Sequence, residues 1–141
     1  MSIYPREESE RLTRKQRIDP KLKLAGWLVA PIAPGKSLAA YGRCAIEEYP
    51  TDDGPADYAL CVDDKILGIV EAKKLTLGPQ NVLTQAERYS KGAVTNPLNY
   101  RGYHVPFLYS TNGEIIWHHD IRSPLSRSHT ITRFHTPNAL A

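Results

Sequence analysis

Two short apolar segments near the middle of the chain limit the possible folds more than any other feature. Residues 58–62 and 66–70 are rich in side chains that favour β-strands, and the polar residues 63–65 separate them. Two such segments with a short polar connection are typical of a β-hairpin, because the chain can reverse there and pair the two strands. The sequence therefore predicts an antiparallel strand pair at the centre of the molecule.

Helices and further strands are predicted on both sides of this hairpin. Residues 7–17 are strong helix formers, and a second short helix is predicted from an N-cap at Asp19 to a stop at Gly26. A longer helix is predicted from Gly78 to near Gly92. The remaining expectations are a loop with room for a short strand over 28–43, strands over 45–49, 107–110 and 114–117, and an irregular tail after 123. This order predicts an α/β fold with a central mixed β-sheet flanked by helices.

The composition fits one globular domain. With 141 residues, 41% of them apolar, the chain is predicted to form a single domain over 1–141. No apolar stretch approaches the roughly 18 residues of a membrane helix, and the charged N-terminus lacks a secretion signal. Cys44 and Cys61 have no metal-binding spacing, and a buried thiol at Cys61 is consistent with the cytoplasm. The net charge of +3 permits a polyanionic partner without requiring one.

The predicted hairpin places three charged side chains on one face. A loop of three residues, 63–65, sets a register in which Asp57 lies directly opposite Glu71. Directly opposed side chains lie about 4.5–5.5 Å apart at Cβ. Lys73 follows Glu71 by two residues and therefore points to the same face. A loop of two residues would shift this register by one and separate the two carboxylates.

Such a pair of carboxylates favours a divalent cation. Like charges this close repel, and burial at the end of an apolar hairpin adds a cost of desolvation. Carboxylate oxygens are the hard ligands that Mg²⁺ prefers, and the carbonyl of Ala72 is a further candidate ligand. Mg²⁺ would bind a phosphate oxygen and activate an attacking water, while Lys73 holds the phosphate. The alternative is a surface charge pair, because an acid-x-Lys triplet is common by chance.

The helix that follows adds two polar candidates. Gln85 and Tyr89 lie four residues apart and therefore share one helical face. Because this helix directly follows the strand that ends near Lys73, the two side chains are candidates for binding a phosphate, a base or a water. The alternative is a surface pair beside Leu83 and Ala86.

The order of these residues resembles a known family. Asp57, then Glu71-x-Lys73, then Gln85-x-x-x-Tyr89 resembles the nuclease family with the PD-(D/E)xK core, although Ala56 stands where the family's name has proline. The glutamine–tyrosine helix is similar to that of the RecB-like branch and of the restriction subunits of type I restriction–modification enzymes. Segments that resemble the N-terminal domain of those subunits cover nearly the whole chain: 10–14, 18–20, 25–27, 56–58, 70–74, 110–113 and 133–137, the last resembling the junction with the family's motor domain.

The resemblance implies a restriction-endonuclease-like core and a role for each matched residue. Asp57 and Glu71 would bind Mg²⁺, and Lys73 would act on the scissile phosphate. Gln85 and Tyr89 would support DNA cleavage from the adjoining helix.

Two assignments implied by the resemblance leave alternatives. Glu10 resembles an acidic residue of the first helix that reaches the metal, and Glu7 and Glu8 are competing candidates. Lys74 competes with Lys73, but strand alternation is expected to point it away from the acids.

Two other patterns are not assigned a phosphate-binding or metal-binding role. Residues 35–37 end like a phosphate-binding loop, but Ala30 stands where the first glycine of that motif belongs, and nearby prolines remove amide donors. The short chain is therefore expected to lack an ATP-driven motor and to be the detached nuclease domain or a fragment of a longer protein. His118 and His119 are adjacent and face opposite sides of a strand, so we interpret them as a surface strand end rather than a metal site.

The sequence thus predicts a Mg²⁺-dependent endonuclease domain that hydrolyses phosphodiester bonds of double-stranded DNA. The resemblance implies that it works within a type I restriction–modification complex, where methyltransferase and specificity subunits are partners through the full-length restriction subunit. Two other functions stay open. One is a non-catalytic module that docks the motor onto a methyltransferase or DNA, and the other is a stand-alone repair or junction-resolving nuclease.

Overall fold

Seven strands form one mixed sheet in the part of the chain that the computed structural model describes, residues 14–73 and 83–141. Neighbours in the sheet follow the order of the chain. The pairs β1–β2 and β4–β5 are parallel, and the other neighbouring pairs are antiparallel. The predicted α/β fold is confirmed. The elements are η1 (Arg14–Ile18, a π-helix), α2 (Asp19–Leu24), β1 (Leu28–Pro31), α3 (Leu38–Tyr41), β2 (Gly42–Thr51), β3 (Gly54–Asp63), β4 (Lys65–Ala72), α4 (Thr84–Gly92), β5 (Phe107–Thr111), β6 (Ile116–Asp120), β7 (His129–Ile131) and α5 (Pro137–Leu140).

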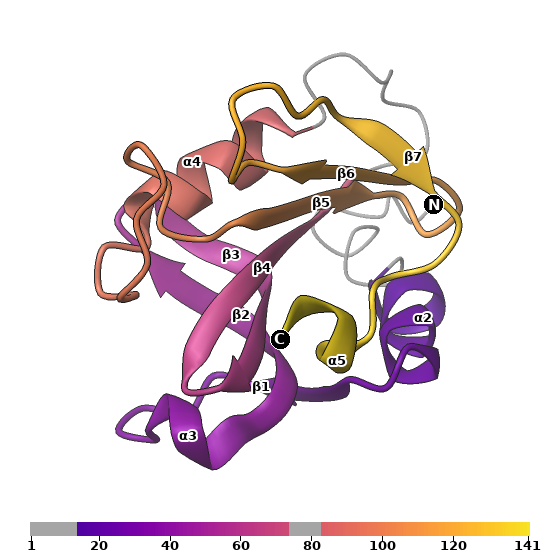
Figure 1. Ribbon diagram of the computed structural model, residues 1–141. Helices are drawn as coiled ribbons and strands as arrows, with labels where there is room; N and C mark the ends of the chain where they lie inside the picture. The colour runs from indigo at the N-terminus through magenta and orange to yellow at the C-terminus, as the bar shows by residue number, and fades with distance from the viewer. Residues whose placement is uncertain (1–13, 74–82) are drawn as a thin grey trace, which may run out of the picture.

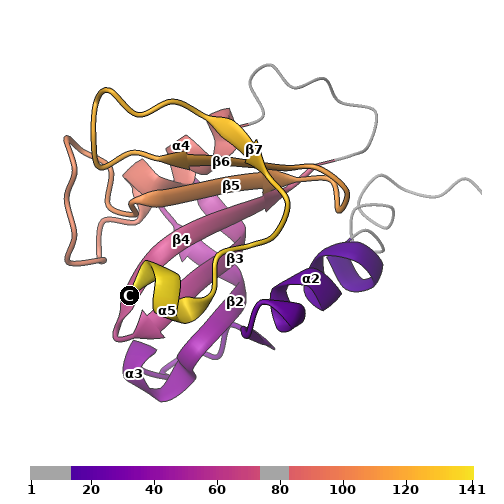
Figure 2. The same ribbon diagram turned by 45° about the vertical axis from the view of Figure 1, so that its right-hand side comes forward.

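Helices cover both faces of the sheet, as Figure 1 and Figure 2 show. On one face, Ala86 of α4 packs in a cluster with Ile69 of β4. On the other face, Leu22 of α2 and Leu140 of α5 pack in a cluster with Val70 of β4. Neighbouring residues of β4 thus enter opposite cores, as strand alternation requires. Among the described residues, no helix is long and apolar enough to span a membrane.

The turn of the central hairpin differs from the prediction. Val62 pairs with Lys65, so the loop between β3 and β4 has two residues rather than three. Asp63 has a φ of 62° at this turn, in the left-handed region that aspartate tolerates better than most residues. The predicted loop length is therefore wrong.

A β-bulge compensates for the shorter turn. The register shifts between Leu60 and Cys61, where β4 carries one extra residue, Leu67. Beyond the bulge, Tyr58 pairs with Val70, which is the register that the sequence analysis expected. The wrong loop length and the unpredicted bulge cancel, so the ends of β3 and β4 face each other as predicted.

Helix α2 has the predicted position but not the predicted cap. Asp19 and Pro20 open the helix, and Gly26, with a φ of 100°, follows its end. No side chain caps the N-terminus. The Asp19 carboxylate instead accepts a hydrogen bond from the buried Tyr58 hydroxyl and lies 3.3 Å from the Lys15 Nζ atom. The cap prediction is wrong because these tertiary partners take the carboxylate and tie α2 to the sheet.

The tail that the sequence analysis left irregular contains β7 and α5. Thr136 caps α5 by accepting a hydrogen bond from the Ala139 N–H, and the buried Phe134 packs in the same core as α2. The Trp27 Nε1–H donates to the His135 carbonyl over 2.9 Å. A three-residue strand and a four-residue helix are too short to give a periodic pattern, which is why the sequence did not reveal them.

Candidate active site

Three of the predicted site residues come together where β3 begins and β4 ends. Asp57 lies near the start of β3, Glu71 near the end of β4, and Lys73 directly after β4. The Asp57 Oδ2 atom accepts a hydrogen bond of 2.7 Å from the backbone N–H of Ala72. The Lys73 Nζ atom lies 3.8 Å from Glu71 Oε1. Two carboxylates and one ammonium group therefore occupy one end of the hairpin.

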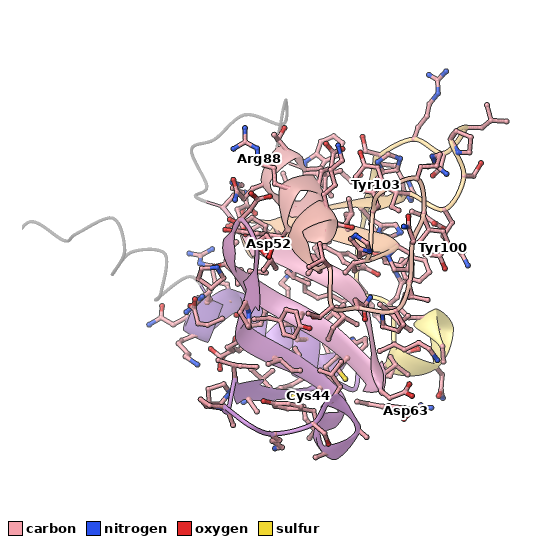
Figure 3. All side chains as sticks on the ribbon, turned by 90° about the vertical axis from the view of Figure 1, so that its left-hand side faces the viewer. Cys44, Asp52, Asp63, Arg88, Tyr100 and Tyr103 are labelled. Atoms are coloured by element: carbon pink, nitrogen blue, oxygen red, sulfur yellow. The ribbon has the colours of Figure 1, made fainter. Side chains whose placement is uncertain are left out.

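This end of the hairpin is remote from its turn. In Figure 3, Asp63 marks the β3–β4 turn at the bottom of the sheet, and Asp52 marks the β2–β3 turn farther up, beside α4. The Asp52 N–H donates to the Gly92 carbonyl over 2.9 Å, which joins this second turn to the end of α4. The candidate site thus lies among strand ends that α4 and the β2–β3 turn hold in place.

Arg14 and Glu48 extend the site. The Arg14 Nη1 atom lies 2.7 Å from Glu48 Oε1 and 3.2 Å from Asp57 Oδ1, so one nitrogen bridges both carboxylates. Glu48 lies on β2 between two pairs of the β2–β3 ladder, opposite Asp57, and has a φ of 60°. We call Arg14, Glu48, Asp57, Glu71 and Lys73 the charged cluster.

The π-helix η1 delivers two basic residues to the sheet. Burial alone would lower the pKa of Arg14, but its hydrogen bond to Glu48 and the negative charges of Asp57 and Glu48 raise that pKa above its usual value. The next residue, Lys15, lies 3.0 Å from Glu47 Oε2 through its Nζ atom. Adjacent basic residues of η1 therefore bind adjacent acidic residues of β2, and the positive charge of Arg14 lies beside Asp57.

The helix α4 brings Gln85 and Tyr89 to the charged cluster, both half-buried. Burial raises the pKa of Tyr89, and the negative charge of Glu71 raises it further. A hydrogen bond with Gln85 acts in the opposite direction, and the charge of Asp57 adds to the rise. Tyr89 therefore keeps its hydroxyl proton within electrostatic range of both carboxylates. Tyr89 thus interacts with the predicted site and with Gln85, and the role of both residues in cleavage stays a prediction.

Other candidates lie outside the described residues. Glu7, Glu8 and Glu10 precede residue 14, and Lys74 falls within 74–82. Their predicted roles stay predictions.

Arg14 and Glu48 are two residues of the charged cluster that were not predicted from the sequence. A signal for Glu48 was present, because antiparallel pairing of the two predicted strands, 45–49 and 58–62, across the Gly- and Pro-containing residues 51–55 places Glu48 opposite Asp57. No comparable signal existed for Arg14, because its contact with the sheet spans 43 residues of sequence.

The donor set of the charged cluster suits Mg²⁺. This ion is usually held by one or two carboxylates and keeps several waters, so it does not need a full cage of side chains. Asp57 and Glu71 supply two carboxylates on neighbouring strands, and Asp57 is already held in place by the Ala72 N–H. In residues 14–73 and 83–141, no group of three or more His, Cys, Asp or Glu side chains could hold a metal ion. A site with two carboxylates and waters is therefore the kind that these residues could form.

A second group of ionisable residues lies on the face of the sheet that α2 and α5 cover. The buried His118 ring stacks on Tyr109, with centroids 4.6 Å apart, and lies edge-to-face with His129 and His135 at 5.6 and 4.8 Å. The Tyr109 hydroxyl lies 2.7 Å from His135 Nδ1. We call Tyr109, His118, His129 and His135 the histidine cluster. The predicted surface position of His118 is wrong, because this side chain packs against β5, β7 and the segment that follows β7.

A cavity of about 330 Å³ lies away from both clusters, between α2 and the segment that leads to α5. No residue of the charged cluster lines it, so the candidate site is a set of strand ends rather than this cavity. Its lining consists of Lys21, Leu24, Ala25, Thr132, Arg133, Phe134 and Thr136.

The chain is similar to a known family and to a solved structure. A family model described as "Type I restriction enzyme EcoKI endonuclease subunit second domain" matches residues 35–141. A solved fragment assigned to the HsdR subunit of a type I restriction enzyme from Vibrio vulnificus is 25% identical, with a TM-score of 0.63. That match covers 93% of this chain and 24% of the solved chain, so this chain spans about a quarter of its relative. No curated protein matches the chain.

Proposed function

We propose a DNA-cleaving function on the premise that this chain belongs to the family of the type I restriction enzyme EcoKI endonuclease subunit second domain. We infer that it is a Mg²⁺-dependent endonuclease domain that hydrolyses phosphodiester bonds of double-stranded DNA. The observation that carries this proposal is the position of Asp57 beside the strand end that bears Glu71 and Lys73. Its partners would be DNA and, through a full-length restriction subunit, methyltransferase and specificity subunits in the cytoplasm.

Each residue of the strand ends has a distinct role in this proposal. Asp57 and Glu71 would hold Mg²⁺, which when bound supplies a Lewis acid for a phosphate oxygen and a water of lowered pKa. The Ala72 N–H orients the Asp57 carboxylate through its 2.7 Å hydrogen bond. Lys73 supplies a positive charge for the scissile phosphate, where charge develops during cleavage.

The experiment measures Mg²⁺ binding by calorimetry and cleavage by plasmid nicking. We expect Asp57→Asn and Glu71→Gln to weaken Mg²⁺ binding by at least about tenfold, because each removes a charged ligand. We expect Lys73→Met to keep Mg²⁺ binding but to nick about a hundredfold more slowly, because it removes stabilisation of the transition state. Asp64→Asn, at the turn end of the same hairpin, is the matched control and should retain both activities.

Two outcomes would contradict the proposal. Mg²⁺ affinity that is the same in wild type, Asp57→Asn and Glu71→Gln would place the metal elsewhere. A wild-type chain that binds Mg²⁺ and DNA together but leaves the plasmid intact would favour the non-catalytic docking module.

A further inference from the structure

We propose that Arg14 is a built-in counter-ion that competes with Mg²⁺ for Asp57, and that Glu48 draws this counter-ion away. The inference rests on the proposed function, because it concerns the metal affinity of the same carboxylates. Arg14 and Glu48 are positioning residues here, since both act through Asp57.

The geometry around Asp57 defines the competition. The Oδ2 atom of Asp57 accepts the Ala72 N–H, and the Oδ1 atom faces the Arg14 Nη1 atom at 3.2 Å. The side chains of Arg14 and Asp57 are 13% and 22% exposed, so water screens their attraction less than at an open surface. A cation that approaches Oδ1 therefore meets the positive charge of Arg14, and the two compete for the same oxygen.

Glu48 offers Arg14 a second partner. The same Nη1 atom lies 2.7 Å from Glu48 Oε1, closer than it lies to Asp57. The Glu48 side chain is 48% exposed, so it is partly solvated where it contacts Arg14. When Mg²⁺ takes Asp57, the guanidinium can keep the Glu48 contact and does not become an unpaired buried charge.

The guanidinium is not locked in place by a full set of hydrogen bonds. Within the described residues, the Arg14 Nε–H is buried and has no hydrogen-bond partner. An unsatisfied buried donor costs free energy, so a small shift of this side chain loses little. The neighbouring Lys15 is tied to Glu47 and Asp19, which restricts a rearrangement to the Arg14 side chain rather than the helix.

The proposal predicts opposite effects for the two partners. By calorimetry with Mg²⁺ on the full chain, we expect Arg14→Met to tighten binding by about tenfold, or about 1.4 kcal/mol. We expect Glu48→Gln to weaken binding by about tenfold, because Arg14 then pairs with Asp57 alone. Arg17→Met is the matched control: this arginine of the same helix pairs with Glu114 at 3.0 Å, and its loss should leave the affinity unchanged.

A double variant separates this proposal from a direct role of Glu48. If Glu48 acts through Arg14, Glu48→Gln has little effect once Arg14→Met is present. Equal weakening by Glu48→Gln in both backgrounds would make Glu48 a metal ligand and overturn the proposal. Weaker Mg²⁺ binding in Arg14→Met would also overturn it, because Arg14 would then support Asp57 rather than compete for it.

A measurement on the wild type covers the case in which a variant fails to fold. In a Mg²⁺ titration followed by NMR of arginine side-chain N–H groups, the Arg14 signal should move with the calorimetric midpoint and the Arg17 signal should not. An unmoved Arg14 signal overturns the inference. If wild type binds no Mg²⁺, the proposed function fails as well; if Asp57→Asn abolishes binding but Arg14→Met and Glu48→Gln change nothing, only this inference fails.

Discussion

The charged cluster and the histidine cluster both bring ionisable side chains together on neighbouring strands. Oppositely charged groups pair in the first cluster, whereas aromatic rings pack against one another in the second. In the charged cluster, Arg14 bridges Glu48 and Asp57, and Lys73 lies beside Glu71. These groups stand at strand ends, where the carboxylates have cationic side chains close by. The arrangement raises the pKa of Arg14 above its usual value, because its acidic partners outweigh the effect of its burial.

The histidine cluster excludes charge instead. Burial and, to a smaller extent, the neighbouring His135 and His129 lower the pKa of His118 to about 4, outweighing the Leu108 carbonyl and Asp120. Burial also lowers the pKa of His135 and raises that of Tyr109. The strand ends of this sheet thus bring charged side chains together, whereas on its covered face the buried His118 ring packs against the C-terminal segment.

The largest effect that tests this contrast is the loss of folding stability at acid pH caused by protonation of His118. The unfolded chain gains a proton near the ordinary histidine pKa of about 6.5, whereas the folded chain gains it near 4. Between these values the unfolded state binds more protons, so the free energy of unfolding falls as pH is lowered. We expect a loss on the order of 3 kcal/mol from pH 7 to pH 4 attributable to this residue. Urea denaturation at a series of pH values measures it.

The variant His118→Phe separates protonation from packing. It keeps a ring against Tyr109 but loses the hydrogen bond that His118 Nδ1–H donates to the Leu108 carbonyl. At pH 8 it should therefore be less stable than wild type, and below pH 6 the two curves should approach each other. Parallel curves over the whole range would mean that the pKa of His118 is the same in the folded and unfolded states.

The next test concerns the bond that ties α2 to the sheet beside the charged cluster. The buried Tyr58 hydroxyl donates to the Asp19 carboxylate, and Tyr58→Phe removes that donor. Because hydrogen bonds to charged groups contribute more than neutral ones, we expect a loss of about 2 kcal/mol in the free energy of unfolding. Tyr41→Phe is the comparison: its hydroxyl accepts from the neutral Ala33 N–H, and the expected loss is about 1 kcal/mol. Equal losses would show that the charge of Asp19 adds nothing.

These clusters also show what a single sequence can and cannot predict. The facing ends of β3 and β4 were predictable, because two apolar runs rich in β-forming residues indicated both strands, and the relative positions of Asp57, Glu71 and Lys73 followed from pairing and alternation. The bulge at Leu67 was not, because it depends on how two cores pack against one strand. The predicted register at the site was therefore correct, although the predicted turn was one residue longer than the actual turn.

Contacts between distant segments account for the other failures. The capping pattern at Asp19 was correct for an isolated helix, but a hydroxyl 39 residues away takes the carboxylate. The burial of His118 depends on packing against β7 and His135. The sequence of the tail gave no sign that β7 would form or that His135 would pack there. Arg14 reaches the site only through the tertiary position of η1. Local patterns identify helices, strands and strand ends, whereas the partners of Asp19, Arg14 and His118 come from segments that lie far away in the sequence.

A smaller effect is expected for Tyr109→Phe in the histidine cluster. The hydroxyl lies 2.7 Å from His135 Nδ1, and both groups are neutral, so the hydrogen bond should contribute about 1 kcal/mol. The acid destabilisation should persist in this variant, because His118 stays buried. If the pH dependence disappears together with the hydroxyl, the whole cluster titrates as one unit rather than through His118.

The smallest effect is expected for Glu114→Gln, an acid that pairs with an arginine of η1 outside both clusters. The side chains of Arg17 and Glu114 are 44% and 62% exposed and lie 3.0 Å apart. Exposed ion pairs are screened by water and salt, so the free energy of unfolding should change by no more than about 0.5 kcal/mol and less at high salt. Glu48→Gln, beside the less exposed Arg14, should cost more in the same denaturation assay. Equal costs would mean that water and salt screen the charges at the strand ends as strongly as those on an open surface. The contrast between the clusters would then rest on the histidines alone.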